Sequence, residues 1–376
     1  MFSDDTHCMS AEVMMTTIPK TTTAKPKLSG IEAARGIAAM MVVFYHAARH
    51  LKADYGALPW LGFSQFGHAG VDFFFVLSGF IIFFVHQKDL GHPSKLFIYF
   101  ERRFTRIYPL FWVSLFVSVF LSLFSSTQKF QGYGVILQNM TLLPLGGDVG
   151  VAWTLQHEIL FYLIFSFALL DRRIGISVFA LWFVFIAVNW TTGFVPPTSP
   201  ALARLASTFN LEFFFGMLAA YLVKHHVANQ RYLFFPLGAI GFFGFAFSEN
   251  IGWFNGYAPS AQVAYGISSM LVVIGIASAN LNGLLKAPRF LTELGSASYS
   301  IYLLHLPCIG VIYKLLAVTG LLTRLPLAVL YALLSAGAIG TCVVISKLLE
   351  YPLMNLVRDL ISGRPHPAKE LGQRAM

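Results

Sequence analysis

The chain has 376 residues, of which 56% are hydrophobic, 15% aromatic and only 11% charged. A soluble domain carries about 25% charged residues, so this composition excludes an ordinary soluble protein. A formal net charge of +9 would favour a nucleic-acid partner in a soluble protein. In a chain this apolar, it is better explained by the sorting of Lys and Arg to the cytoplasmic side of a membrane, and we expect no nucleic-acid partner.

The chain divides into three expected parts. The first 29 residues are polar and lack the apolar core of a signal peptide, which predicts a disordered cytoplasmic tail over 1–29. A membrane domain is expected over 30–355, followed by a second cytoplasmic tail over 356–376. No further domain is expected after the last apolar run.

Ten apolar runs are candidates for membrane spans. Their continuity excludes the alternating pattern of barrel strands, so they are predicted to be helices. The run at 233–248 is the shortest, and a stretch at 133–145 is too brief to span. The predicted spans are 31–50, 69–87, 107–126, 151–170, 174–191, 205–223, 233–248, 261–279, 297–317 and 326–347.

The positive charges predict the orientation of these spans. With the amino terminus in the cytoplasm, the inside segments hold 19 of the 26 Lys and Arg residues and the outside segments hold 5. This bias predicts that both termini are cytoplasmic. We therefore expect an all-α integral membrane protein with about ten transmembrane helices around a cavity.

We predict a cavity because the first span carries two polar residues, Arg35 and His46. Eleven residues apart at about 100° per residue, they return to nearly the same helix face, about 16 Å apart along the axis. Charges inside a membrane helix are costly and usually face a polar cavity. The alternatives are that Arg35 snorkels to lipid headgroups and that His46 only caps a helix end.

Three carboxylate or imidazole side chains are expected near the depth of His46. Asp72 begins the second span from the outer side, and His157 and Glu158 lie in the outer half of the fourth. Asp72 could orient an imidazole or simply favour the first turn of its helix. Glu158 could relay protons or make a structural hydrogen bond to a neighbouring helix.

Arg102, Arg103 and Arg106 cluster at the cytoplasmic end of the third span. Such a cluster can anchor a helix at the membrane surface. It can also bind phosphates, because the guanidinium group is a planar fork of donors. Coenzyme A carries three phosphates and is made in the cytoplasm.

Several of these blocks resemble a known family. Arg35-Gly36-Ile37-Ala38-Ala39 with Val42-Val43-Phe44-Tyr45-His46 is similar to the Arg-x10-His signature of membrane-bound acyltransferase family 3, the O-acyltransferases of bacterial surface polysaccharides. Four further blocks are similar to the family: the segments around Asp72 and around Arg102–Arg106, and the segments Trp153–Tyr162 and Ser298–Pro307. In the third of these, Thr154 stands where the family usually has Ser. The resemblance covers roughly residues 28 to 355, and the opening of the first span looks most similar to the exopolysaccharide-acetylating branch.

The resemblance implies a function and a set of site residues. It implies transfer of an acyl group, most simply acetyl, from cytoplasmic acetyl-CoA to a hydroxyl of an exported glycan, in the bacterial inner membrane. His46 would act as general base or carry the acyl group itself, and Asp72 or Glu158 would orient it. Arg35, Arg102, Arg103 and Arg106 would hold the CoA phosphates, and Trp153, Tyr302 and His305 would line the acyl path. For His305 the alternative is a hydrogen bond to a carbonyl freed by Pro307.

A transporter or flippase of a polar solute or a lipid-linked sugar is the alternative function. Ten helices with buried charges would suit it, but the chain shows neither an internal repeat nor a pair of broken helices in matching halves. No metal site is expected, and no ATP-binding loop is present. Besides the bilayer, acyl-CoA and the glycan, expected partners are a separate periplasmic transferase or polysaccharide-synthesis proteins.

Overall fold

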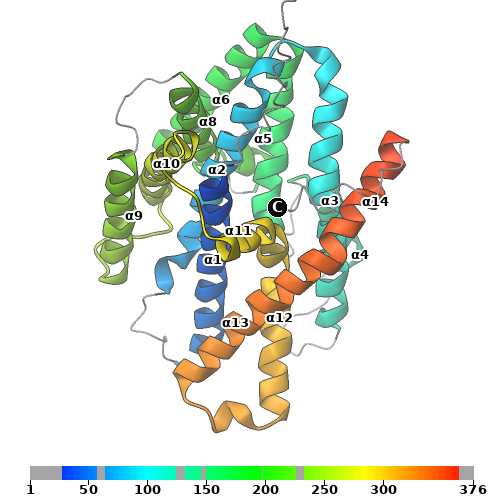
Figure 1. Ribbon diagram of the computed structural model, residues 1–376, viewed down its shortest axis with the longest axis vertical. Helices are drawn as coiled ribbons and strands as arrows, with labels where there is room; N and C mark the ends of the chain where they lie inside the picture. The colour runs from blue at the N-terminus through cyan, green and yellow to red at the C-terminus, as the bar shows by residue number, and fades with distance from the viewer. Residues whose placement is uncertain are drawn as a thin grey trace, which may run out of the picture.

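The computed structural model describes residues 28–56, 64–123, 132–144, 150–196, 198–225 and 233–363. All regular secondary structure in these ranges is helical (Figure 1). The α-helices are α1 (Ser29–Tyr55), α2 (Gly70–His86), α3 (Leu96–Ser122), α4 (Tyr133–Thr141), α5 (Ala152–Leu170), α6 (Arg172–Thr192), α7 (Pro200–Leu205), α8 (Asn210–Lys224), α9 (Phe234–Asn250), α10 (Pro259–Leu281), α11 (Arg289–Ser296), α12 (Ser298–Val318), α13 (Leu327–Ile345) and α14 (Tyr351–Ser362). The prediction of an all-α membrane protein is confirmed.

The helices match the predicted spans closely. Among the described residues, nine helical segments are long and apolar enough to cross a membrane. The seventh predicted span, 233–248, coincides with α9, which has 17 residues. At 1.5 Å per residue α9 is about 26 Å long, slightly less than the hydrocarbon core of about 30 Å. The stretch predicted to be too short to span forms α4, with 9 residues.

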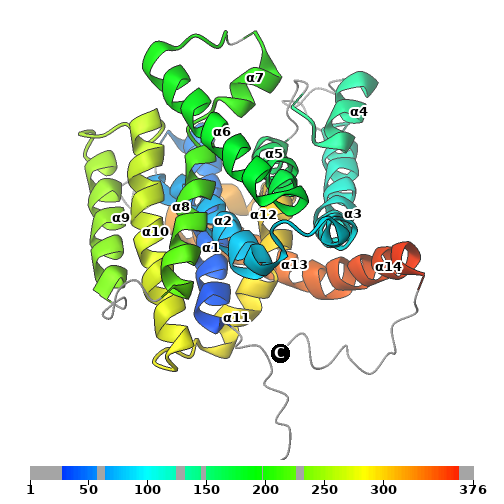
Figure 2. The ribbon, with the colours of Figure 1, turned by 90° about the horizontal axis from the view of Figure 1, so that it is seen from above.

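Helix α1 lies at the centre of the helix assembly (Figures 1 and 2). It packs against α2, α10, α11, α12 and α13. Small buried residues make these close contacts possible, because small side chains let helix backbones approach. At Gly36, for example, an added Cβ would lie 2.8 Å from the backbone nitrogen of Gly295 in α11. The residues of α1 are therefore surrounded by protein along most of its length.

Helices α2 and α8 pack against each other through glycines on both sides. A Cβ added at Gly79 would collide with the Phe213 carbonyl, and one at Gly216 with the Val76 carbonyl. Gly79 therefore permits the close approach of the two helices. Its neighbour Ser78 donates a hydrogen bond of 3.2 Å to Glu158.

Pro307 lies inside α12 and has no N–H to donate to the carbonyl of Leu303. The Ser114 hydroxyl of α3 donates to this carbonyl at 3.1 Å. The freed group is therefore satisfied from a neighbouring helix. His305 therefore does not bond the carbonyl that Pro307 frees, which was the alternative role predicted for it.

The predicted tails fall largely on residues that the structure does not describe. Residues 1–27 and 364–376 lie outside the described ranges. At the carboxyl end, α14 continues to Ser362, past the expected end of the membrane domain at residue 355. In Figure 1 this helix runs outward alongside α3.

Candidate active site

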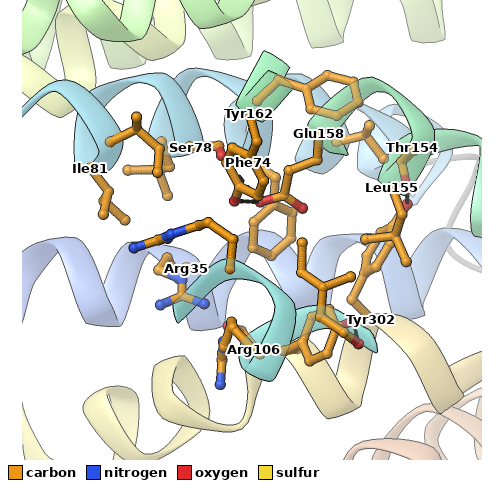
Figure 3. A pocket seen from close by; sticks show the side chains of 18 residues that line it. Arg35, Phe74, Ser78, Ile81, Arg106, Thr154, Leu155, Glu158, Tyr162 and Tyr302 are labelled. Carbon is orange, nitrogen blue, oxygen red and sulfur yellow. Dashed lines mark hydrogen bonds between the residues drawn. The ribbon is translucent and has the colours of Figure 1, made fainter. Parts of the chain in front are cut away.

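A cavity of about 880 Å³, counted to its open mouth, lies between α1, α2, α3, α5 and α12. Its polar lining comes from residues far apart in the chain (Figure 3). These are Arg35, Ser78, Arg103, Arg106, Thr154, Glu158, Tyr162, Ser298, Tyr299 and Tyr302.

Three arginines meet at this cavity. Arg35 comes from α1, and Arg103 and Arg106 come from α3. The Arg103 guanidinium lies 5.7 Å from the centre of the Tyr162 ring, and its buried Nε has no hydrogen-bond partner among the described residues. A buried donor without a partner is costly, so this end of the cavity is suited to an anionic ligand.

Arg106 is also part of a buried ion pair. Its Nη1 lies 2.5 Å from Oε1 of Glu350, whose side chain is 3% exposed. Oε2 of Glu350 accepts hydrogen bonds from Ser300 and Ser346 at 2.6 and 2.8 Å. Arg106 is thereby fixed at the cavity wall.

Glu158 is the carboxylate of the cavity. Its Oε1 accepts hydrogen bonds from the hydroxyls of Ser78 and Tyr162. Figure 3 shows Glu158 and Tyr162 on one side of the cavity and Arg35 and Arg106 on the other. Glu158 is close enough to Arg35 to interact with it electrostatically. Glu158 therefore lies among the arginines rather than beside His46, which differs from the expected arrangement.

Tyr302 and Thr154 line the cavity together. Thr154 Oγ1 donates to the Val151 carbonyl at 2.9 Å, so the Tyr302 hydroxyl is the donor in the 2.6 Å bond between the two side chains. The Tyr302 ring lies 6.1 Å from the ring of His305. Tyr302 thus separates the arginine-lined cavity from the histidines beyond it.

His46 and His305 form a pair, with their ring centres 5.0 Å apart. His305 Nδ1 lies 2.7 Å from the Tyr302 carbonyl and 3.1 Å from the Ile301 carbonyl. Carbonyl oxygens only accept, so Nδ1 of His305 carries a proton and Nε2 of the neutral ring carries the lone pair. His46 is half-buried and makes no hydrogen bond to described residues. Neither ring nitrogen of His46 is therefore held by a described side chain or carbonyl.

Asp72 contacts a different set of groups from those expected. It is buried on α2 and interacts with Glu212 of α8 and with His68. Neither Asp72 nor Glu158 makes a hydrogen bond to His46 within the described chain. Asp72 interacts instead with a residue of α8, the helix against which α2 packs closely. The structure therefore does not show the expected orienting carboxylate.

Three further predicted residues lie outside the cavity lining. Arg102 is exposed, one residue before the cavity residue Arg103. Trp153 packs on Phe209, with ring centres 5.3 Å apart. His157 is fully buried and its Nδ1 lies 2.8 Å from Oδ1 of Asn210.

His46 and His50 are four residues apart on α1, a spacing that can serve metal binding in a helix. However, His50 packs edge-on against Tyr313, with ring centres 4.5 Å apart. No group of three or more metal-ligating side chains occurs among the described residues.

The sequence interpretation did not assign site roles to Ser78 and Tyr162. Tyr162 follows Glu158 by four residues, so a helical projection places the two side chains on one face. That spacing was available in the sequence. Ser78 lies 80 positions before Glu158, and only the packed structure shows their hydrogen bond.

Comparison with known proteins identifies the chain. The exopolysaccharide production protein ExoZ of Rhizobium meliloti (strain 1021) is 28% identical over 302 residues, which cover 77% of this chain and 90% of ExoZ. No solved structure is significantly similar. The family described as "acyltransferase domain" (acyltransferase family 3) matches residues 28–347. The match spans α1 to α13 and includes every residue that lines the arginine-lined cavity. The chain therefore belongs to the acyltransferase 3 family and is a multi-pass membrane protein.

Proposed function

We propose that this membrane acyltransferase moves an acyl group, acetyl in the simplest case, from cytoplasmic acyl-CoA to a hydroxyl of an exported polysaccharide. The observation that carries the proposal is the convergence of Arg35, Arg103 and Arg106 on one cavity, with His46 about three helical turns along α1 from Arg35 and paired with His305. The similarity to ExoZ, an exopolysaccharide production protein, supports a polysaccharide acceptor. The bacterial inner membrane is the proposed location, since it separates the cytoplasmic donor from an exported acceptor.

The arginine end of the cavity fits the phosphates of CoA. Guanidinium groups bind phosphates through paired hydrogen bonds, and the unpartnered Arg103 Nε is available for one of them. The flexible arm of the donor would then extend past Tyr302 toward His46. When bound, acyl-CoA would supply a thioester, whose carbonyl carbon is the electrophile.

His46 is proposed to act on the acceptor. In the direct route, its imidazole takes the proton of the acceptor hydroxyl, the oxygen forms the ester bond, and the C–S bond breaks to release CoA thiolate. In the second route, the His46 nitrogen first forms an acyl-imidazole and releases the thiolate, and the acceptor hydroxyl then takes the acyl group. His305, with its Nδ1 proton fixed by backbone carbonyls, positions the His46 ring in both routes.

The donor site is tested by isothermal titration of the purified protein with CoA, which binds without being consumed. Replacing Arg35 or Arg103 with Gln removes a charged hydrogen-bond donor, worth about 1.5–3 kcal/mol, and should raise the Kd about 10- to 100-fold. Arg102→Gln is the matched control, because Arg102 is exposed and lies outside the cavity lining.

The outcome distinguishes three possibilities. A loss of CoA affinity in the Arg35 and Arg103 variants alone supports the proposed donor site. An equal loss of affinity in Arg102→Gln would mean that CoA binds the cluster at the helix surface instead of the cavity. Absence of CoA binding by the parent protein, with several acyl-CoA thioesters also tried, would favour the transporter or flippase alternative.

A further inference from the structure

A second cavity lies at the opposite end of α1 from Arg35. It encloses about 860 Å³ of empty space, counted to its open mouth, and is lined by Tyr45, Ala48, Arg49, Lys52, Ala53, Ser64, Gln65 and Tyr257. The described lining contains two cations and no carboxylate. None of these residues has a role in the donor site.

The cavity wall is a connected polar network. Arg49 Nη1 donates to the Tyr45 hydroxyl at 2.8 Å, and the Tyr45 and Tyr257 hydroxyls are 2.5 Å apart. Tyr257 stacks on the ring of His68, with centres 4.5 Å apart and an interplanar angle of 22°. His68 Nε2 lies 2.9 Å from Glu249. The tyrosine rings and Arg49 are thus held in fixed positions, as expected of a preorganised site.

The nearby carboxylates are occupied elsewhere. Glu249 is buried, and it interacts with His68 and with the hydroxyl of Tyr265 at 2.8 Å. Asp54 accepts a hydrogen bond from Tyr313 of α12 and does not line the cavity. Arg49 and Lys52 are both exposed, so the described lining of the cavity carries two positive charges and no negative one.

This cavity is adjacent to the histidine pair. Tyr45 directly precedes His46, and their rings lie 4.9 Å apart. Arg49 follows His46 by three residues, which brings the two side chains to neighbouring positions on α1. On the orientation predicted from the charges, Arg49 and Lys52 are also two of the few cations on the outer side, against the usual bias.

We propose that this second cavity binds the acceptor and selects a saccharide that carries a carboxylate, such as a uronic acid unit. Arg49 and Lys52 would bind the carboxylate, Tyr257 would pack against a sugar ring, and Gln65 and Ser64 would bond sugar hydroxyls. The target hydroxyl would then point down α1 toward His46. The proposal rests on the proposed function, because it assigns the acceptor side of the same reaction.

The test uses the full-length protein in nanodiscs of phosphatidylcholine. Isothermal titration compares a glucuronic-acid-containing tetrasaccharide with the same tetrasaccharide after reduction of its carboxylate to an alcohol. The parent should bind the acid form at least 10-fold more tightly, and added salt should reduce the difference. Lys52→Gln should remove most of this preference, Lys52→Arg should keep it, and Arg324→Gln, an exposed cation outside the cavity, should leave it unchanged.

Three results would overturn the proposal. The first is equal affinity for the acid and reduced forms. The second is that Lys52→Gln and Arg324→Gln lose the preference for the acid form to the same extent, which would assign the preference to general surface charge. The third is abolition of binding by phosphatidylglycerol in the nanodisc, which would make a lipid phosphate the occupant. CoA titration of the same samples tests the donor site separately, so failure of the two proposals can be told apart.

Discussion

At the scale of single residues, the site combines side chains with fixed structural partners and side chains without them. Arg106 is held by the buried carboxylate of Glu350, whose second oxygen accepts from Ser300 and Ser346. Arg103 Nε has no hydrogen-bond partner in the described chain. The first kind of residue builds the cavity wall, and the second kind is available to a ligand.

The ion pair of Arg106 and Glu350 gives a stability prediction. Glu350→Ala would leave the Arg106 charge without its partner, and breaking a buried pair in this way costs about 3 kcal/mol or more. The thermal unfolding midpoint in detergent should therefore fall by several degrees. Glu293→Gln, which removes two ion pairs between exposed side chains, should leave the midpoint almost unchanged. Similar losses in the two variants would show that the Glu350 pair has no special structural role.

At the scale of helices, close packing depends on glycines at defined crossings. Gly79 of α2 faces the Phe213 carbonyl of α8, whereas Gly244 of α9 has no atom within 4 Å of an added Cβ. This contrast between two helical glycines separates a packing requirement from the general effect of glycine on a helix.

Replacing Gly79 with Ala should force α2 and α8 apart and lower the unfolding midpoint. Gly244→Ala should leave the midpoint unchanged or raise it, since Ala is favoured over Gly in helices by about 1 kcal/mol in water. The measurement is thermal unfolding of both variants in the same detergent. A stable Gly79→Ala protein would show that this helix crossing can relax without cost.

At the scale of the whole molecule, the arginine-lined cavity and the second cavity lie toward opposite ends of the central helix α1. The charge distribution predicts that the arginine end faces the cytoplasm. Cysteine labelling in intact cells tests this orientation. In a cysteine-free background, an impermeant maleimide should label Arg324→Cys from outside, and should label Arg173→Cys only after the membrane is permeabilised. The reverse pattern would place the donor cavity on the wrong side for cytoplasmic acyl-CoA.

Much of the fold could be predicted because long apolar runs permit few structures other than membrane helices. The convergence of Arg35, Arg103 and Arg106 followed from placing the ends of two spans at one membrane face. The partners of Asp72 and Glu158 did not follow, because depth along a helix does not determine which neighbour a side chain faces. Asp72 interacts with Glu212 because α2 packs closely against α8, and the sequence does not show which helices pack together.

His46 is the residue proposed to carry the chemistry of acyl transfer. The most direct test follows radiolabelled acetyl from acetyl-CoA into an exported-polysaccharide extract, using the parent protein, His46→Ala and His50→Ala in detergent. His50 is the matched control, because it lies one turn along α1 and packs against Tyr313. We expect label in the polysaccharide with the parent and with His50→Ala, and none above background with His46→Ala. Undiminished transfer by His46→Ala would contradict the proposed role of His46.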